Sequence, residues 1–420
     1  MSSRNATLTF RGEFQKAPRR FGPAYLARAS IARRLGALEG GQLHVRDTWG
    51  EWQAGDGSAK AIELRILDAG VYLALAAGGS IGVARAFMDG RWECSDLTGL
   101  LRLFIRNMPV VDGVETGLAW FTNLAARVQH KLRANSHSGS RRNIREHYDL
   151  GNAFFALFLD ETMTYSAGIF EQDSSTMRDA SLAKLDRICR KLELGPADHL
   201  LEIGTGWGGM AIYAARHTGC RVTTTTISRE QYVLARERVA AAGLEDRVTV
   251  LLEDYRDLTG RYDKLVSLEM IEAIGHRYFD TYFAQCGRLL KDDGLMLLQA
   301  ITIADQRYEA ARHSVDFIQR HIFPGSTIPS VTAMIGAITR RSDMKLVDLE
   351  DIGPHYATTL RRWRENFFAR IGEVRALGYP ETFVRMWEFY LCYCEGGFEE
   401  RAIGDVQMLL AKPGNRRGVP

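Results

Sequence analysis

Short apolar runs alternate with amphipathic segments through the second half of the chain. Five of these runs are typical of buried strands, at residues 199–203, 221–226, 247–252, 264–268 and 295–299. Between them, apolar residues recur three and four positions apart, which predicts helices at 210–216, 230–242 and 278–290. Strands that alternate with helices indicate an α/β fold built on a doubly wound parallel sheet.

The first third of the chain has a different pattern. Strand-like pieces at 41–45 and 61–67 are mixed with helical pieces at 81–88 and 100–107, so we predict a smaller α+β domain there. A stretch of small and polar residues then resembles a linker. We therefore divide the chain into an N-terminal domain at 1–133, a linker at 134–145 and a second domain at 146–420.

Composition limits the class of protein. The 420 residues are 46% hydrophobic and 25% charged, which is ordinary for a soluble globular chain and excludes collagen, coiled coil and wholesale disorder. The apolar runs fall short of the ~18 residues that a membrane span needs, and the first residues lack the apolar core of an export signal. Six scattered cysteines form no CxxC pair, so we expect a reducing cytoplasm, no disulfide framework and no metal site.

The net charge is only +3, but basic residues gather in two blocks. Residues 1–46 hold nine Arg or Lys against two Glu, and residues 116–145 hold six Arg or Lys and no acid. Such blocks are either solvated faces or a surface for anionic phospholipid headgroups, where each basic residue contributes ~1 kcal/mol. The small net charge argues against nucleic-acid binding.

A glycine-rich loop follows the first strand of the predicted sheet and opens a helix. It contains Gly204, Gly206 and Gly208, which let a ligand approach the backbone at a helix N-terminus. The second strand lacks the terminal acid that a dinucleotide site uses for the ribose. Instead, Glu202 precedes the loop and Asp254 ends the third strand, as in methyltransferases. We predict a Rossmann-like class I domain that binds S-adenosylmethionine. NAD is the weaker alternative as ligand, and a glycine turn with a purely structural role is the other alternative.

Further motifs resemble the cyclopropane-fatty-acyl-phospholipid synthases and the related mycolic-acid cyclopropane synthases. They occur in the family's order at residues 147–152, 163–166, 201–209, 226–231, 267–272, 322–325, 355–360 and 394–398. The resemblance implies that a methylene passes from S-adenosylmethionine to the cis double bond of an unsaturated phospholipid acyl chain. The alkene attacks the sulfonium methyl, a carbocation forms, and a bound bicarbonate removes a proton as the ring closes. The resemblance also suggests a homodimer, and we expect a cytoplasmic protein held peripherally on the inner face of the membrane.

The resemblance assigns two groups of site residues. Those expected to bind S-adenosylmethionine are Tyr165, Ser166, Glu202, Gly204, Gly206, Trp207, Gly208, Thr226, Ser228, Gln231, Asp254 and Tyr255. Those expected at the reaction centre are Glu272, Tyr356, Cys394, Gln299 and Ile301. Glu272 matches the family's essential glutamate, Tyr356 the tyrosine that hydrogen-bonds bicarbonate, and Ile301 a backbone contact to the same anion. Cys394 matches the cysteine of a C-terminal motif, although a buried cysteine or tyrosine can equally be a core residue.

Three departures from the family pattern concern the bicarbonate. Ala167 and Ala273 stand where many members have cysteine and histidine, and Gln299 stands where they have another histidine. A glutamine can donate a hydrogen bond to the anion but cannot carry a proton away. We therefore expect bicarbonate to be held less well, and a methyl-branched or methylene lipid is the alternative product. Two other possibilities are a lipid-binding protein without catalysis and a methyltransferase for a soluble molecule.

Overall fold

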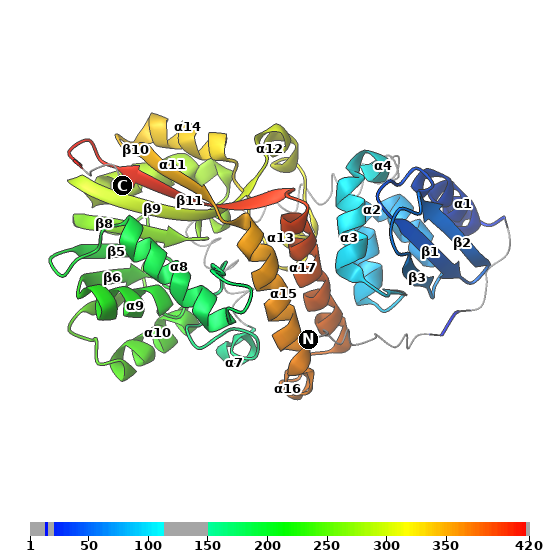
Figure 1. The fold of residues 1–420 in the computed structure, drawn as a ribbon, viewed down its shortest axis with the longest axis horizontal. Coiled ribbons are helices and arrows are strands. Elements are labelled where there is room, and N and C mark those ends of the chain that lie inside the picture. Colours follow the sequence, from blue (N-terminus) through cyan, green and yellow to red (C-terminus); the bar gives the residue numbers. More distant parts are fainter. Residues whose placement is uncertain (1–12, 16–20, 113–149, 417–420) are drawn as a thin grey trace. The chain divides into compact units, whose positions relative to one another are not determined.

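The computed structural model describes residues 13–15, 21–112 and 150–416, and these fall into two compact units (Figure 1). The first unit contains residues 1–129, 314–320 and 375–400, and the second contains 130–313, 321–374 and 401–420. The predicted linker at 134–145 lies outside the described residues. The first unit also takes in two later segments of the chain, which the predicted limits of the N-terminal domain do not include.

The first unit is built on a four-stranded sheet in the order β2-β1-β3-β4. Strand β1 pairs antiparallel with β2 and parallel with β3. The predicted pieces at 41–45, 61–67, 81–88 and 100–107 fall within or largely overlap β1, β3, α2 and α3. The elements are α1 (Pro23–Leu35), β1 (Gln42–Asp47), β2 (Gly50–Gly55), β3 (Ile62–Ile66), α2 (Gly70–Met88), β4 (Trp92–Cys94), α3 (Leu97–Arg106), α4 (Met108–Asp112) and α17 (Glu381–Glu399).

Helix α2 corrects one expectation from the sequence. Its 19 residues include an 18-residue window with a mean hydropathy of 1.5. By length and composition, this one described helix could therefore cross a membrane. The expectation that no apolar stretch reaches this length was wrong, because alanines and glycines extend the predicted helix at 81–88 towards the N-terminus. Core helices of soluble proteins pass the same test, and Gly79 breaks the helical geometry of α2 with a φ of 55°.

The second unit contains a seven-stranded sheet in the order β10-β11-β9-β8-β5-β6-β7, which confirms the predicted doubly wound fold. Five neighbouring strands are parallel, β11 pairs antiparallel with β9, and β10 pairs antiparallel with β11. The five strands are β5 (His199–Ile203), β6 (Arg221–Thr225), β7 (Val248–Leu251), β8 (Tyr262–Leu268) and β9 (Leu290–Ile303), and the added pair is β10 (Lys345–Asp351) and β11 (Ile403–Ala411).

Helices cover both faces of this sheet (Figure 1). Apolar residues of α11 and α14 pack on one face and those of α8, α9 and α10 on the other. Leu201 belongs to the first core and its neighbour Leu200 to the second, as the alternation of side chains along a strand requires. The helices of this unit are α7 (Asn152–Phe155), α8 (Met177–Lys191), α9 (Gly209–Thr218), α10 (Arg229–Ala241), α11 (Phe279–Leu289), α12 (Asp305–Ala311), α14 (Val331–Arg341) and α15 (Gly353–Ala369), with 3-10 turns η1 (Ile271–Ala273) and η2 (His276–Tyr278). Helices α13 (Phe317–His321) and α16 (Ile371–Ala376) lie where the chain passes between the units.

Candidate active site

The glycine loop joins β5 to α9 at the carboxyl edge of the sheet. Gly204, Gly206 and Gly208 have φ values of 103°, 52° and 86°, a region that residues with a Cβ rarely adopt. Doubly wound sheets bind ligands at this edge, where the helix N-terminus favours negative charge. The buried Trp207 ring is held by an indole N–H that donates to the Asn152 side chain over 2.7 Å. The loop therefore has the shape expected of a binding loop for S-adenosylmethionine.

Glu202 lies at the end of β5 with almost no exposure to solvent. Its carboxylate accepts a hydrogen bond of 2.6 Å from the Thr224 hydroxyl, which in turn contacts the Thr205 hydroxyl at 2.7 Å. Burial raises the pKa of Glu202 to about 8. A positively charged ligand or a pair of ribose hydroxyls would favour its ionised form.

The segment after β6 prepares the start of α10. The Ser228 hydroxyl caps this helix by accepting from the Gln231 backbone N–H, and the Thr226 hydroxyl donates to the Gln231 side chain over 2.8 Å. All three residues are buried. They follow the carboxyl end of β6, which neighbours β5. Their side chains could therefore contact a ribose or adenine bound over the glycine loop.

Asp254 and Tyr255, which follow β7, are less available for binding the co-substrate than the sequence suggested. The Asp254 carboxylate accepts hydrogen bonds from the Arg256 guanidinium at 2.8 and 2.7 Å, so it is paired within the protein. Tyr255 belongs to the apolar core and its ring packs edge-on against Tyr282. Their contribution to co-substrate binding stays a prediction.

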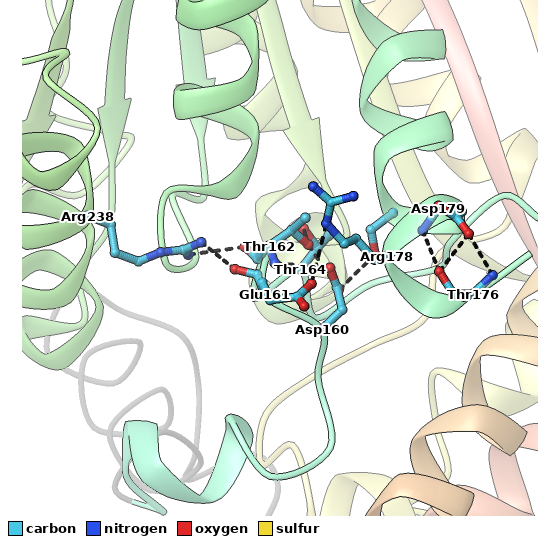
Figure 2. A network of polar contacts seen from close by, with 9 residues as sticks. Asp160, Glu161, Thr162, Thr164, Thr176, Arg178, Asp179 and Arg238 are labelled. Atoms are coloured by element: carbon cyan, nitrogen blue, oxygen red, sulfur yellow. Dashed lines mark hydrogen bonds and ion pairs between the residues drawn. The ribbon is translucent and has the colours of Figure 1, made fainter.

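The loop before Tyr165 is fastened to the glycine loop by one arginine of α10. Figure 2 shows Arg238 reaching the backbone carbonyls of Glu161 and Thr162, at 2.8 and 3.1 Å. The same guanidinium donates to the Trp207 carbonyl over 2.7 Å. Asp160 holds the other side of this loop, because its carboxylate accepts from the Thr162 hydroxyl at 3.0 Å. Arg238 thus fixes two segments that are both predicted to bind the co-substrate.

Replacing Arg238 by alanine should weaken the binding of S-adenosylmethionine about tenfold. Three hydrogen bonds from a charged donor are lost, and two loops lose their fixed separation. Calorimetric titration measures the effect, with Arg236→Ala as the control because Arg236 is exposed on the same helix. Equal affinity in the two variants would contradict this role.

A series of aromatic rings connects the glycine loop with the second part of the site. Phe155 lies 4.9 Å from Trp207 and 5.2 Å from Tyr165, measured between ring centroids. Tyr165 stacks on Trp363 at 5.1 Å, and Trp363 meets the edge of Tyr356 at 6.2 Å. Aromatic faces of this kind exclude water and can stabilise a nearby cation.

Ser166, the second residue of the predicted Tyr-Ser pair, is buried beside a lysine. Its hydroxyl contacts the Lys184 ammonium, which projects from α8 and is itself completely buried. Burial lowers the pKa of Lys184 to about 8, although the charges of Glu269, Asp405 and Asp160 favour its protonated form. The lysine supplies a buried positive charge that the sequence analysis did not identify.

A carboxylate that the sequence analysis also missed occupies the centre of the site. Glu269 follows β8, and its two oxygens accept hydrogen bonds from the Tyr356 hydroxyl at 2.6 Å and the Gln299 amide at 2.7 Å. The backbone N–H of Ala167 donates to the same carboxylate over 3.0 Å. Tyr356, Gln299 and Ala167 are the positions at which the resemblance implies ligands of bicarbonate.

Strand β11 completes this network. The Gln299 amide nitrogen also donates to Asp405 over 3.0 Å, and its oxygen accepts from Gln407 at 3.1 Å. An amide nitrogen has two hydrogens, so both are used on carboxylates of the protein. Burial and the charges of Glu269 and Glu272 raise the pKa of Asp405 well above its usual range.

Glu272 stands on the turn η1, next to this network. One of its oxygens accepts from the Ile301 backbone N–H over 2.5 Å, and the other has no hydrogen-bond partner among the described residues. Burial, followed by the charge of Glu269, raises the pKa of Glu272 to about 8. The structure thus brings Glu272, Gln299, Ile301 and Tyr356 together, and their role as a reaction centre stays a prediction.

These contacts do not fit a bound bicarbonate. The hydroxyl of Tyr356 and the amide of Gln299 donate to Glu269 and Asp405, and the N–H of Ile301 donates to Glu272. Each donor that the sequence analysis assigned to the anion is therefore paired with a protein carboxylate.

Cys394 is the fifth residue predicted at the reaction centre. It lies on α17 in the first unit, while the other four lie in the second. Burial and the charge of Asp316 raise its pKa, so its thiol is not activated as a nucleophile. Its role stays a prediction. Within the described ranges, no group of three or more His, Cys, Asp or Glu side chains could hold a metal ion.

Comparison with known proteins decides the family. The sequence profile described as mycolic acid cyclopropane synthetase matches residues 135–408. The chain belongs to this family. Like other mycolic acid cyclopropane synthetase family members, it is an enzyme that uses S-adenosylmethionine as co-substrate and transfers a one-carbon group to lipid.

Relatives of this family member include both methyltransferases and cyclopropane synthases. Tuberculostearic acid methyltransferase UfaA1 of Mycobacterium tuberculosis is 39% identical over 95% of this chain and 94% of the relative. Cyclopropane-fatty-acyl-phospholipid synthase of Escherichia coli is 37% identical over 85% of this chain and 89% of the relative. Mycolic acid cyclopropane synthase CmaA1, solved with SAH and CTAB, is 32% identical with a TM-score of 0.61 over 65% of this chain and 98% of its own.

Proposed function

We propose that this enzyme transfers a methylene from S-adenosylmethionine to the cis double bond of an unsaturated phospholipid acyl chain, giving a cyclopropane. The observation that carries the proposal is the connection between the glycine loop and the carboxylates. The rings of Trp207, Phe155, Tyr165 and Trp363 run from one to the other. The relative from Escherichia coli, whose printed name is that of a phospholipid cyclopropane synthase, supports the choice of substrate.

The chemistry requires three things of the site. The co-substrate must be held rigidly, water must be excluded because it would trap a carbocation, and a base must accept one proton. The loops that Arg238 fixes hold the co-substrate, and the aromatic series excludes water. The carboxylate pair of Glu269 and Glu272 supplies the base. A negative charge beside the cation lowers the barrier further.

The test is expression in a host whose membrane lipids contain cis-unsaturated chains but no cyclopropane. We expect fatty acids heavier by one CH₂, with ring-methylene protons at high field in the NMR spectrum of the lipid. Unchanged lipid, with protein that is folded and binds S-adenosylmethionine, would contradict the proposal. Activity on a soluble acceptor without any bilayer would favour the small-molecule alternative instead.

A second product is favoured by one observation. The relative of greatest matched length among those named here is a methyltransferase, not a cyclopropane synthase, by its printed name. If a hydride first shifts from the methylated carbon to the cation, loss of a proton from the methyl group gives an exocyclic methylene, and loss of a proton from a neighbouring chain carbon gives a methyl-branched alkene. The same NMR spectrum separates the two, because an exocyclic methylene gives vinyl protons and no ring signal.

We also propose that the protein works in the cytoplasm and binds the inner face of the membrane through α1. Leu26 on this helix and Phe21 just before it are 59% and 80% exposed, and Arg33 and Arg34 are exposed about two turns after Leu26. Apolar residues beside arginines are typical of helices that lie on anionic membranes. The basic block at 116–145 lies outside the described residues.

Leu26→Glu should weaken the binding of anionic vesicles about tenfold, because an apolar contact is lost and a like charge is added. Vesicle flotation measures it, and added salt should weaken binding of the unchanged protein as well. Leu377→Glu is the control, since Leu377 is an exposed leucine elsewhere in the first unit. Equal losses in both variants would exclude a specific role for α1.

A further inference from the structure

We infer that the carboxylate of Glu269 is itself the base of the reaction and takes the position that the family resemblance gives to bicarbonate. The inference rests on the proposed function and adds to it a residue of this chain. It predicts an enzyme whose turnover does not depend on dissolved bicarbonate.

The hydrogen-bond pattern around Glu269 supports the inference first. A planar group with two oxygens is held by the Tyr356 hydroxyl at 2.6 Å, the Gln299 amide at 2.7 Å and the Ala167 N–H at 3.0 Å. Carboxylate and bicarbonate present the same pair of acceptor oxygens to donors in a plane. The side chain of Ala167 is only a methyl group, so it leaves this space to the Glu269 carboxylate.

The backbone of Glu269 supports it independently. Its φ is 49°, in the left-handed region, where a residue with a Cβ is less stable than glycine. A hydrogen bond of 2.8 Å from the Glu269 N–H to the Gln299 carbonyl holds this conformation at the end of β8. Strained backbone of this kind persists where the side chain has a task, and here the strain directs a carboxylate to the cluster.

The surroundings of Glu269 suit a base. It is partly exposed, whereas Asp405 and Glu272 are buried, so Glu269 can contact substrate and later return its proton to water. Among the described residues, Glu269 interacts electrostatically with three ionisable groups, which are the Lys184 ammonium and the carboxyl groups of Asp405 and Glu272. The buried Lys184 ammonium places a positive charge near this carboxylate.

The step balances in atoms and electrons. The π pair of the alkene forms a carbon–carbon bond to the methyl group, and the carbon–sulfur bond breaks with its pair left on sulfur. A cation remains on the acyl chain. One C–H bond of the new methyl then breaks, its electron pair closes the ring, and the proton passes to the Glu269 carboxylate. Loss of a chain proton instead would use the same base.

Two variants and one labelled ion test the inference. Glu269→Gly removes the carboxylate and relieves the backbone, and Glu269→Gln keeps the shape without the charge. Turnover of unsaturated phospholipid in buffer free of carbon dioxide should equal that with added bicarbonate for the unchanged enzyme. Both variants should lose about a hundredfold or more, and added bicarbonate should restore part of the activity of Glu269→Gly. Glu245→Gln, an exposed acid, is the control.

A binding measurement separates this inference from the proposed function. NMR of isotopically labelled bicarbonate should show saturable binding to Glu269→Gly and none to the unchanged protein, whether or not lipid is turned over. Melting temperature and binding of S-adenosylhomocysteine verify that the variants fold. Bicarbonate binding by the unchanged protein, or an active Glu269→Gln, would overturn the inference. Absence of turnover under every condition would refute the proposed function alone.

Discussion

Glu272→Gln should lower the turnover of unsaturated phospholipid about a thousandfold while leaving the affinity for S-adenosylmethionine unchanged. One oxygen of Glu272 lies buried with no hydrogen-bond partner among the described residues, and the other accepts from the Ile301 backbone. Glutamine keeps the second contact but removes the negative charge. Loss of one preorganised charge at a reacting centre costs about this much.

The pH profile distinguishes this electrostatic role from a structural one. Burial and the charge of Glu269 raise the pKa of Glu272 to about 8, so its carboxyl is mostly protonated below that pH. If the ionised form is required, kcat/KM should rise with pH up to about 8 and then level off. The Glu272→Gln variant should lack this rise. A profile identical in both proteins would contradict the assignment.

Lys184→Met should stabilise the protein by about 2 kcal/mol near neutral pH. The methionine fills similar volume without a charge, whereas burying the Lys184 ammonium costs more than its attraction to Glu269 and Asp405 returns, which is why its pKa is lowered. Urea unfolding measures the change, with Arg190→Met as the control on the same helix, because Arg190 is exposed and its ion pair is a surface pair.

The difference in stability between the two proteins should shrink as pH rises. The pKa of Lys184 is lowered to about 8, so the unfolded chain binds more protons than the folded one between about 8 and the usual pKa of lysine. The unchanged protein should therefore gain stability as pH rises through this window, and the methionine variant should not. A methionine variant that is less stable than the unchanged protein at neutral pH would show instead that the carboxylates need the charge of the lysine.

The central sheet could be predicted because its strands are short, apolar and separated by helices of clear period. The expected strand at residues 199–203 coincides with β5, and those at 264–268 and 295–299 lie inside β8 and β9. The antiparallel pair was missed for a physical reason. Strand β10 is an edge strand with mostly exposed residues, so its apolar pattern is weak.

The site was predicted in part. Four of the five reaction-centre residues, Glu272, Gln299, Ile301 and Tyr356, lie together, although no local pattern brings them from four segments into one place. Asp405 and Gln407 could have been noticed as polar residues alternating with apolar ones in a buried strand, and Lys184 as a charge on the apolar face of α8.

Glu269 was overlooked because it precedes a glutamate with a better motif match. Both acids follow the same strand, and sequence spacing alone cannot say which one the tyrosine contacts. Only the coordinates show that the Tyr356 hydroxyl donates to Glu269. The Tyr356 and Gln299 donors that were expected to contact bicarbonate donate to the Glu269 carboxylate instead.

The position of β11 has a consequence for synthesis of the protein. This strand lies between β9 and β10 in the sheet, yet it is the last strand along the described chain, and it carries Asp405 and Gln407 into the carboxylate network. A growing polypeptide can form the glycine loop and the neighbouring parallel strands before these residues have left the ribosome. The nascent chain can thus form its donor-binding loop early, while its acid–base chemistry has to wait until β11 has been synthesised.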